Sequence, residues 1–151
     1  MLPEPWHALP AALPGEPPQG AHGHGEGAVP RATRILIVED EVFVAMDAEA
    51  ILRSAGYEVV GTAASADDAV AKAGRLAPDL VLMDIRLNGR RDGIDAAVEI
   101  MQKFKLPVIF VTANVDPVTD ARALQAKPLA VVSKPFTTAS LLAAVAKFKR
   151  G

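Results

Sequence analysis

Four short apolar runs in this sequence of 151 residues are each followed by polar residues that could do chemistry. Glu39 and Asp40 follow Ile-Leu-Ile-Val, and Asp84 follows Leu-Val-Leu-Met. Thr112 follows Val-Ile-Phe-Val, and Lys134 stands two residues after Leu-Ala-Val-Val. Three carboxylates, a hydroxyl and an ammonium group therefore occupy similar places after separate apolar runs.

The charge of this set limits what it could do. Three carboxylates at one place repel one another, and each would hold its proton too tightly unless a cation intervened. Lys134 supplies one positive charge, so a hard divalent ion such as Mg²⁺ or Mn²⁺ is the expected complement. No histidine, cysteine or base-activated serine accompanies the set, which leaves acyl transfer by a catalytic triad unsupported.

Phosphoryl chemistry with a carboxylate nucleophile fits the set best. Asp84 would attack phosphorus, while the metal and Lys134 neutralise the transferring oxygens and Thr112 donates a hydrogen bond to one of them. Ala113 is small, leaves room for a donor or a water, and offers a backbone N–H to the phosphoryl group. The product would be a labile mixed anhydride, which suits a signal better than a store.

These residues need elements that bring the ends of the apolar runs together. Each of these four runs, and a fifth predicted strand at 58–63, is followed by a helical pattern, so five such pairs come in succession, with Gly56 placed to end the first helix. The pattern predicts an α/β fold: a five-stranded parallel sheet of flavodoxin-like order 2-1-3-4-5, with helices on both faces. We expect strands at 35–38, 58–63, 79–83, 107–111 and 129–132, and helices at 42–55, 66–75, 94–104, 116–124 and 138–148.

In such a sheet the carboxyl ends of the strands meet at one edge, so the polar residues named above would converge there. The first predicted helix presents Val44, Ala48, Ile51, Leu52 and Ala55 on one face, which we expect to be its core face.

The first 33 residues differ in composition from the remainder. They hold seven of the twelve prolines and all three histidines, and predict a disordered Pro/Gly-rich extension before a folded domain at 34–151. Their three glutamates and one arginine carry the whole net charge of −2. The neutral domain has no basic stripe, so direct nucleic-acid binding is not expected. No membrane-length apolar run occurs, and the absence of cysteine is consistent with a cytoplasmic location.

Four motifs follow one another along the chain: VEDE at 38–41, LVLMDI at 80–85, VTA at 111–113 and SKPF at 133–136. Together they resemble the signature of the receiver domain of response regulators in two-component signalling, and the resemblance covers roughly residues 34–149. By this resemblance Asp84 matches the phospho-acceptor and Asp40 a direct Mg²⁺ ligand. Glu39 matches a second acid that often acts through water, and Arg86 the position that gives its backbone carbonyl to the metal.

The same resemblance assigns Thr112 as the switch hydroxyl and Lys134 as the lysine of the family. It also implies a cis peptide bond between Lys134 and Pro135, although about 5% of such bonds are cis in folded proteins. Val131 stands where members often carry an aromatic residue. Output would therefore pass through loop and backbone shifts alone, or the conformational change would be muted.

Two further departures concern the surroundings of the acceptor. The loop at 85–93 lacks the usual proline and carries Arg90 and Arg91, for which a contact with a partner and a solvated loop are equal alternatives. Arg86 and Asn114 stand at positions that flank the path of the attacking water in the family. A large cation and an amide there should alter phosphoryl lifetime.

The expected function is that of a single-domain response regulator that takes a phosphoryl group from a histidine kinase or a histidine phosphotransfer protein. Only 17 residues follow Lys134, so output would be contact with a protein target or relay of the phosphate. Val42, Phe43 and Met46 form an apolar patch on the first helix that we interpret as a docking surface. A weak homodimer is left open.

Such a protein would lose its own phosphate but would not be a turnover enzyme. Three alternatives stand beside this reading: a binding module independent of phosphorylation, a phosphate sink, and an aspartyl-nucleophile phosphohydrolase. The last would need an acid/base aspartate where Arg86 stands.

Overall fold

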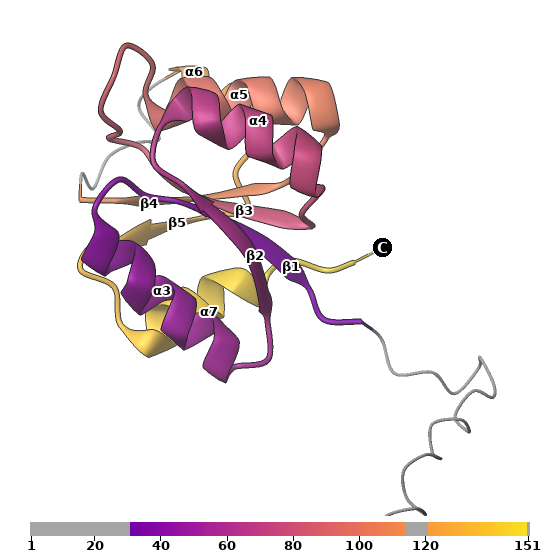
Figure 1. Cartoon of the computed structure of the whole chain (residues 1–151), viewed down its shortest axis with the longest axis vertical. Coiled ribbons are helices and arrows are strands. Elements are labelled where there is room, and N and C mark those ends of the chain that lie inside the picture. The colour runs from indigo at the N-terminus through magenta and orange to yellow at the C-terminus, as the bar shows by residue number, and fades with distance from the viewer. Residues whose placement is uncertain (1–30, 114–120, 151) are drawn as a thin grey trace, which may run out of the picture. The chain divides into compact units, whose positions relative to one another are not determined.

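Five parallel strands form one sheet in the order β2-β1-β3-β4-β5 (Figure 1). The strands are β1 Arg34–Val38, β2 Glu58–Ala63, β3 Leu80–Asp84, β4 Val108–Thr112 and β5 Ala130–Ser133. The order confirms the predicted topology. Strands β3, β4 and β5 each begin and end one residue later than predicted. Asp84 and Thr112 are therefore the last residues of β3 and β4.

A computed structural model describes residues 31–113 and 121–150. The extension expected over residues 1–33 falls almost wholly outside them, as do Asn114 and the start of the helix expected at 116–124. Contacts divide the chain into Met1–Arg31 and Ala32–Gly151, and the sheet belongs to the second unit. The helices of the described part of the chain are α3 Val42–Ser54, α4 Ala66–Leu76, α5 Gly93–Phe104, α6 Ala121–Ala126 and α7 Thr138–Val145.

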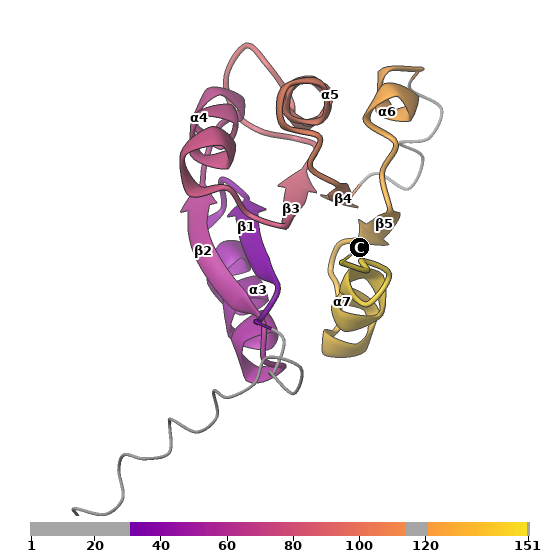
Figure 2. The same ribbon diagram turned by 90° about the vertical axis from the view of Figure 1, so that its right-hand side faces the viewer.

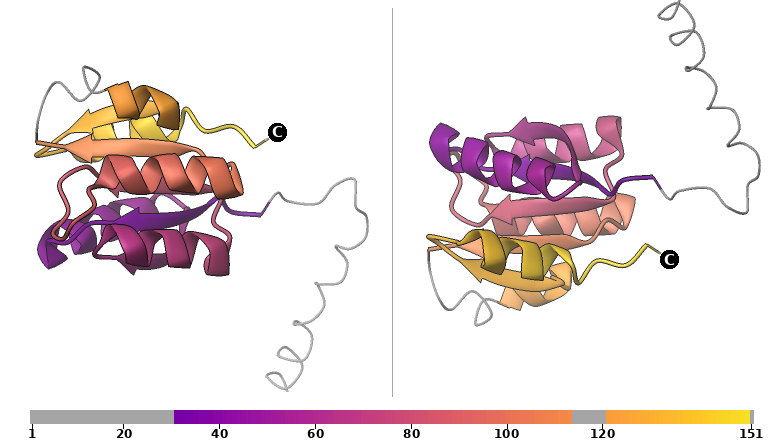
Figure 3. Two further views of the ribbon diagram at one scale, coloured as in Figure 1. Left: turned by 90° about the horizontal axis from the view of Figure 1, so that it is seen from above. Right: turned by 90° about the horizontal axis from the view of Figure 1, so that it is seen from below.

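The helices cover both faces of the sheet, as predicted. Helices α3 and α7 lie on one face, and α4, α5 and α6 lie on the other (Figures 1 and 3). The view in Figure 2 places these two helical layers on opposite sides of the strands. Helix α6 ends two residues later than predicted, and α7 ends at Val145 rather than Phe148. None of the helices described has the length and apolar character needed to cross a membrane.

The unbroken apolar runs are explained by the two helical layers. Successive strand residues point to opposite faces, so a strand covered on both sides must be apolar at every position. Ile35 and Ile37 of β1 pack in the cluster under α3 and α7, whereas Leu36 and Val38 pack in the cluster under α4, α5 and α6. The sheet is thereby held rigidly between two cores.

Helix α3 ends at Ser54, one residue earlier than predicted, and Gly56 stops it as predicted: its φ of +95° lies in the left-handed region that favours glycine. The Gly56 N–H donates to the Arg53 carbonyl at 3.1 Å, and the Tyr57 N–H donates to the Leu52 carbonyl at 3.0 Å. These two bonds form a Schellman motif. Ala55 is the C-cap and is exposed, so its assignment to the core face was wrong: the chain leaves the helix at this residue.

Two of the helices that border the site begin at side-chain caps. The Ser65 side chain accepts a hydrogen bond from the Asp68 N–H at the start of α4. Asp67 and Asp68 lie in the first turn of this helix, where the positive end of the helix dipole stabilises their negative charges. At the start of α5, Asp92 and Asp95 form a reciprocal capping box.

Candidate functional site

The carboxyl ends of adjacent strands bring the predicted residues together. Strand β1 pairs with β3, β3 with β4, and β4 with β5, all in parallel. Glu39 follows β1 directly, Asp84 and Thr112 end their strands, and Lys134 follows β5. Each residue therefore reaches the same edge of the sheet.

Glu39, Asp40 and Asp84 form one acidic cluster. Each offers a carboxylate oxygen, and these oxygens all lie within 4.8 Å of one another. Glu39 is 7% exposed and Asp84 is 4% exposed, while Asp40 is half-buried. Three carboxylate oxygens gathered in this way match the hard oxygen ligands that Mg²⁺ takes in proteins.

Lys134 is the cation that faces this cluster. Its Nζ lies 2.7 Å from Glu39 Oε1 and 3.2 Å from Asp84 Oδ2. Burial lowers the pKa of Lys134, but the hydrogen bond with Glu39 and the charge of Asp84 outweigh it, and the pKa is raised overall. Burial raises the pKa of Glu39 despite the opposing hydrogen bond from Lys134. One ammonium thus serves two buried acids, and a third acid stands beside them.

Backbone amides hold the orientation of all three carboxylates. Two of these amides belong to the loop between β3 and α5. This loop therefore begins at Asp84 and also folds back to contact the acidic cluster. The donors are Glu41 N–H to Glu39 Oε2 at 3.0 Å, Arg86 N–H to Asp84 Oδ1 at 3.1 Å and Asn88 N–H to Asp40 Oδ2 at 3.2 Å. That the Arg86 carbonyl binds a metal ion stays a prediction.

Strand β4 ends beside the lysine motif. Thr112 is 1% exposed, and its carbonyl accepts the Lys134 N–H at 2.9 Å. Ala113 follows it and is exposed. The peptide bond between Lys134 and Pro135 is cis, which confirms that expectation.

A groove of about 490 Å³ lies between α3 and the lysine motif, and Lys134, which pairs with Glu39 and Asp84, is one of its lining residues. Phe43 and Val44 line it together with Pro135 and Phe136. Its charged or small lining residues are Glu41, Asp47, Lys134 and Ala113. The predicted apolar patch lies on the exposed face of α3: Val42 is 67% exposed, Phe43 83% and Met46 58%. The contribution of Pro135 and Phe136 to the groove could not be predicted from the sequence, because two residues beside the lysine motif form no periodic pattern of their own.

Gly93 was also missed. A Cβ built on it would lie 1.9 Å from the Asp84 carbonyl oxygen, so the first residue of α5 rests directly on the backbone of Asp84. The only signal in the sequence was a glycine at a helix start, which usually reports a turn or cap rather than a close approach to a site.

Arg91, in the loop between β3 and α5, does what neither alternative predicted: it neither faces solvent alone nor is left free for a partner, because it binds two acids of this chain. Its guanidinium bridges Asp67 of α4 at 2.8 Å and Glu99 of α5 at 2.5 Å. Hydrogen bonds from Lys103 and Arg91 hold the pKa of Glu99 below its ordinary value. The loop is therefore tied to two helices, while Arg90 is exposed.

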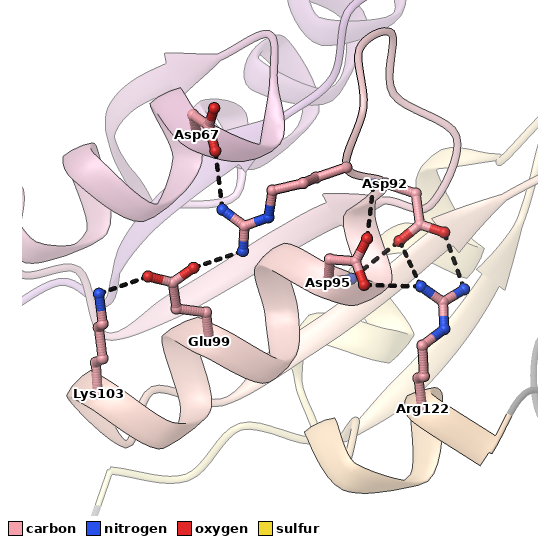
Figure 4. Close-up of polar contacts among 7 residues, drawn as sticks. Asp67, Asp92, Asp95, Glu99, Lys103 and Arg122 are labelled. Carbon is pink, nitrogen blue, oxygen red and sulfur yellow. Dashed lines mark hydrogen bonds and ion pairs between the residues drawn. The ribbon is translucent and has the colours of Figure 1, made fainter.

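A second arginine, Arg122 of α6, binds the capping box of α5. It contacts Asp92 at 3.0 Å and Asp95 at 2.8 Å (Figure 4). Burial raises the pKa of Asp92, but the Asp95 amide and Arg122 lower it by more, so the pKa lies below its ordinary value.

This depressed pKa predicts a pH-dependent effect of Asp92→Asn. Asparagine caps a helix as well as aspartate, so only the charge is lost. At neutral pH we expect the free energy of unfolding to fall by about 0.5–1 kcal/mol, a small value because solvent screens a half-exposed ion pair. Stability from a depressed carboxyl pKa exists above the unfolded pKa and disappears as pH falls through the folded one. Denaturant melts at decreasing pH should therefore converge, and a constant difference would contradict the ion pair.

The comparisons with known proteins agree with this geometry. Residues 35–146 match the response regulator receiver domain family. The chain belongs to this family. The receiver domain is 43% identical over 120 residues to the transcriptional regulatory protein PdtaR of Mycobacterium tuberculosis, covering 80% of this chain and 57% of PdtaR. It is 37% identical over 123 residues to the phyllosphere-induced regulator PhyR of Methylorubrum extorquens, covering 81% and 45%.

A solved receiver domain shares both the fold and the sequence pattern. It is the signal receiver domain of a modulated diguanylate cyclase from Desulfovibrio desulfuricans, with a TM-score of 0.70 and 34% identity over 76% of this chain and 91% of that one. The chain spans about half the length of the curated relatives it matches. It is thus a receiver domain of response regulators, which are generally signalling proteins rather than enzymes.

Proposed function

We propose that this receiver domain accepts a phosphoryl group on Asp84 from a histidine kinase or a histidine phosphotransfer protein. The observation that carries the proposal is the setting of the Asp84 carboxylate. It is almost fully buried, yet it lies among two further acids and is held by Lys134 on one oxygen and by the Arg86 amide on the other. A carboxylate held in this way is oriented before the donor arrives.

The transfer balances as a displacement at phosphorus. A bond forms between an Asp84 carboxylate oxygen and phosphorus, and the bond from phosphorus to the histidine nitrogen breaks, so the imidazole leaves with the electron pair. Lys134 would pair with a phosphoryl oxygen, and the Thr112 hydroxyl and Ala113 N–H would donate to the others. The phosphate later leaves by hydrolysis or by transfer to another histidine.

The acidic cluster fits a divalent cation. Asp40, Asp84 and the Arg86 carbonyl would bind Mg²⁺ or Mn²⁺ directly, and Glu39 directly or through water. The ion, when bound, neutralises charge on the phosphoryl oxygens. Two buried acids already share Lys134, so the cluster keeps an excess of negative charge that a cation would offset.

Labelling with acetyl phosphate tests this proposal. In the presence of Mg²⁺ the wild-type chain should gain one phosphoryl group by intact-mass analysis, with acetate as the leaving group. Chelation of the metal by EDTA should reduce the labelling rate by about 100-fold or more, because the three acids then repel the incoming phosphate. A wild-type chain that stays unlabelled in Mg²⁺ would overturn the proposed function and favour a binding module independent of phosphorylation.

The groove between α3 and the lysine motif is the proposed docking surface for the phosphodonor. It places Phe43 on the same concavity as Lys134 and Ala113. An apolar helix of a histidine protein could lie against Val42, Phe43 and Met46 while its phosphohistidine reaches Asp84. Output would then be contact with a protein target, relay of the phosphate or its removal as a sink.

Replacement of Phe43 by aspartate should separate protein donors from small ones. With a phosphorylated histidine phosphotransfer protein that labels the wild-type chain, Phe43→Asp should slow transfer by about tenfold or more, because a charge enters an apolar contact. Labelling by acetyl phosphate should slow much less. Leu124→Asp, at an exposed position on α6, is the matched control. Equal slowing with both donors would reject docking on this patch.

A further inference from the structure

The loop between β3 and α5 connects the acidic site with a helix on the far side of α5. At one end, its amides hold Asp84 and Asp40. At the other end, Asp92 caps α5 and accepts two hydrogen bonds from Arg122, which belongs to α6 (Figure 4). Helix α6 is therefore attached by side chains to the same loop that holds the acceptor.

The connection from Asp84 to Asp92 is short and rigid. The Gly93 N–H donates to the Ile85 carbonyl at 2.8 Å, and the backbone of Gly93 rests against the Asp84 carbonyl oxygen. Asp92 precedes Gly93 and is locked to Asp95 by the capping box. Backbone movement at Asp84 or Ile85 must therefore displace the start of α5, because packed backbone atoms have no slack to absorb it.

The contact between Arg122 and the capping box is sensitive to such a displacement of the start of α5. Its Nη1 lies 2.8 Å from Asp95 Oδ1 and 3.3 Å from Asp92 Oδ1, and its Nη2 lies 3.0 Å from Asp92 Oδ2. One planar guanidinium thus engages both acids of the capping box, and such forked pairing has a narrow geometric tolerance. A rotation of the capping box would either carry α6 with it or break these bonds.

A second set of ion pairs, centred on Arg91 and Glu99, limits which helices can move relative to one another. Arg91 links Asp67 of α4 with Glu99 of α5, and Glu99 also pairs with Lys103. These contacts hold α4 and α5 together on the side away from α6. Helix α6, with six described residues, is a smaller element, and its Leu124 is 64% exposed.

We propose that the bridge from Arg122 to Asp92 and Asp95 transmits the phosphorylation state of Asp84 to α6. The inference rests on the proposed function, because a phosphoryl group on Asp84 would change the charge and bulk of the carboxylate that the Arg86 amide holds.

Amide NMR spectra of the full chain test the bridge, with beryllium fluoride and Mg²⁺ as the phosphoryl mimic. In the wild-type chain, shift changes should appear in the loop residues 85–88 and in α6. In Arg122→Gln the loop changes should persist, whereas those in α6 should shrink by about fivefold. Arg91→Gln is the matched control, since it removes the other loop bridge, and it should keep the α6 response.

A double variant, Asp92→Asn with Asp95→Asn, removes the other side of the bridge while both residues still cap α5. It should reproduce the loss in α6, whereas Arg122→Lys, which keeps the charge, should restore part of the response. Acetyl phosphate labelling of each variant should match the wild type. A labelled Arg122→Gln chain with an unchanged α6 response would overturn the inference alone. An unlabelled wild-type chain would overturn the proposed function and the inference together.

Discussion

Asp84→Asn is expected to remove acetyl phosphate labelling to background, a loss of about 1,000-fold or more. Asparagine has nearly the same shape, and its amide oxygen can still accept the Arg86 N–H that Asp84 Oδ1 accepts at 3.1 Å. An amide oxygen carries no full charge and forms no stable acyl phosphate. The substitution therefore removes the nucleophile and keeps the Arg86 bond, but its NH2 group stands in the place of Asp84 Oδ2 and gives up the 3.2 Å contact with Lys134 Nζ.

The fold should survive this change, so that lost labelling reports chemistry. Lys134 keeps its 2.7 Å contact with Glu39, and one of three repelling acids becomes neutral. Thermal unfolding followed by circular dichroism should show the variant to be at least as stable as the wild type. Residual labelling at the wild-type rate would place the acceptor elsewhere.

Two further variants sharpen the interpretation. Asp40→Asn keeps the acceptor and removes a proposed metal ligand, so labelling should persist but require a higher Mg²⁺ concentration. Asp68→Asn removes a carboxylate that pairs with Lys72 on α4 and should label as the wild type does. If Asp40→Asn showed the same Mg²⁺ dependence as Asp68→Asn, Asp40 would not be a metal ligand.

The second large effect is expected for Gly93→Ala, which should lower the free energy of unfolding by about 3 kcal/mol. The added Cβ would lie 1.9 Å from the Asp84 carbonyl oxygen, 2.8 Å from the Asp84 carbonyl carbon and 2.9 Å from the Ile85 Cα. All three are backbone atoms of the rigid sheet edge, and none can swing away as a side chain could. The start of α5 must move outward and lose its bond to Ile85.

The sign of this effect is informative because alanine in a helix is ordinarily more favourable than glycine by about 0.5–1 kcal/mol. Gly61→Ala is the control: its Cβ would meet the Leu76 Cδ1 at 2.9 Å, and that flexible side chain can shift. Urea unfolding of both variants should show a much smaller loss for Gly61→Ala. Equal losses would mean that the contact with the Asp84 backbone is not decisive.

Much of the site could be predicted from local patterns. Glu39, Asp84 and Thr112 each close an apolar run, and strands covered on both faces must be apolar along their length. Five alternating pairs left few possible topologies, and the expected strand order was correct. The predictions that were wrong concern the ends of helices and strands. At Ala55, for example, the chain leaves α3, and this departure exposes a side chain that was expected in the core.

The polar connections could not be predicted in the same way. Arg91 and Arg122 lie in or near loops, where charges follow no period, and each finds acids on other elements. The sequence distance between Arg122 and Asp92 is 30 residues, and nothing local connects them. Their pairing depends on how closely α6 packs against α5.

By itself, then, the sequence determined the parallel sheet and the edge at which the acids, Thr112 and Lys134 gather, because burial periodicity and strand direction are encoded residue by residue. Only the tertiary structure decided that Gly93 rests on the backbone of Asp84 and that Arg122 joins the capping box to α6. These contacts arise from distances between separately formed elements. Such distances are set by packing of side chains in the two cores, which no short stretch of sequence specifies.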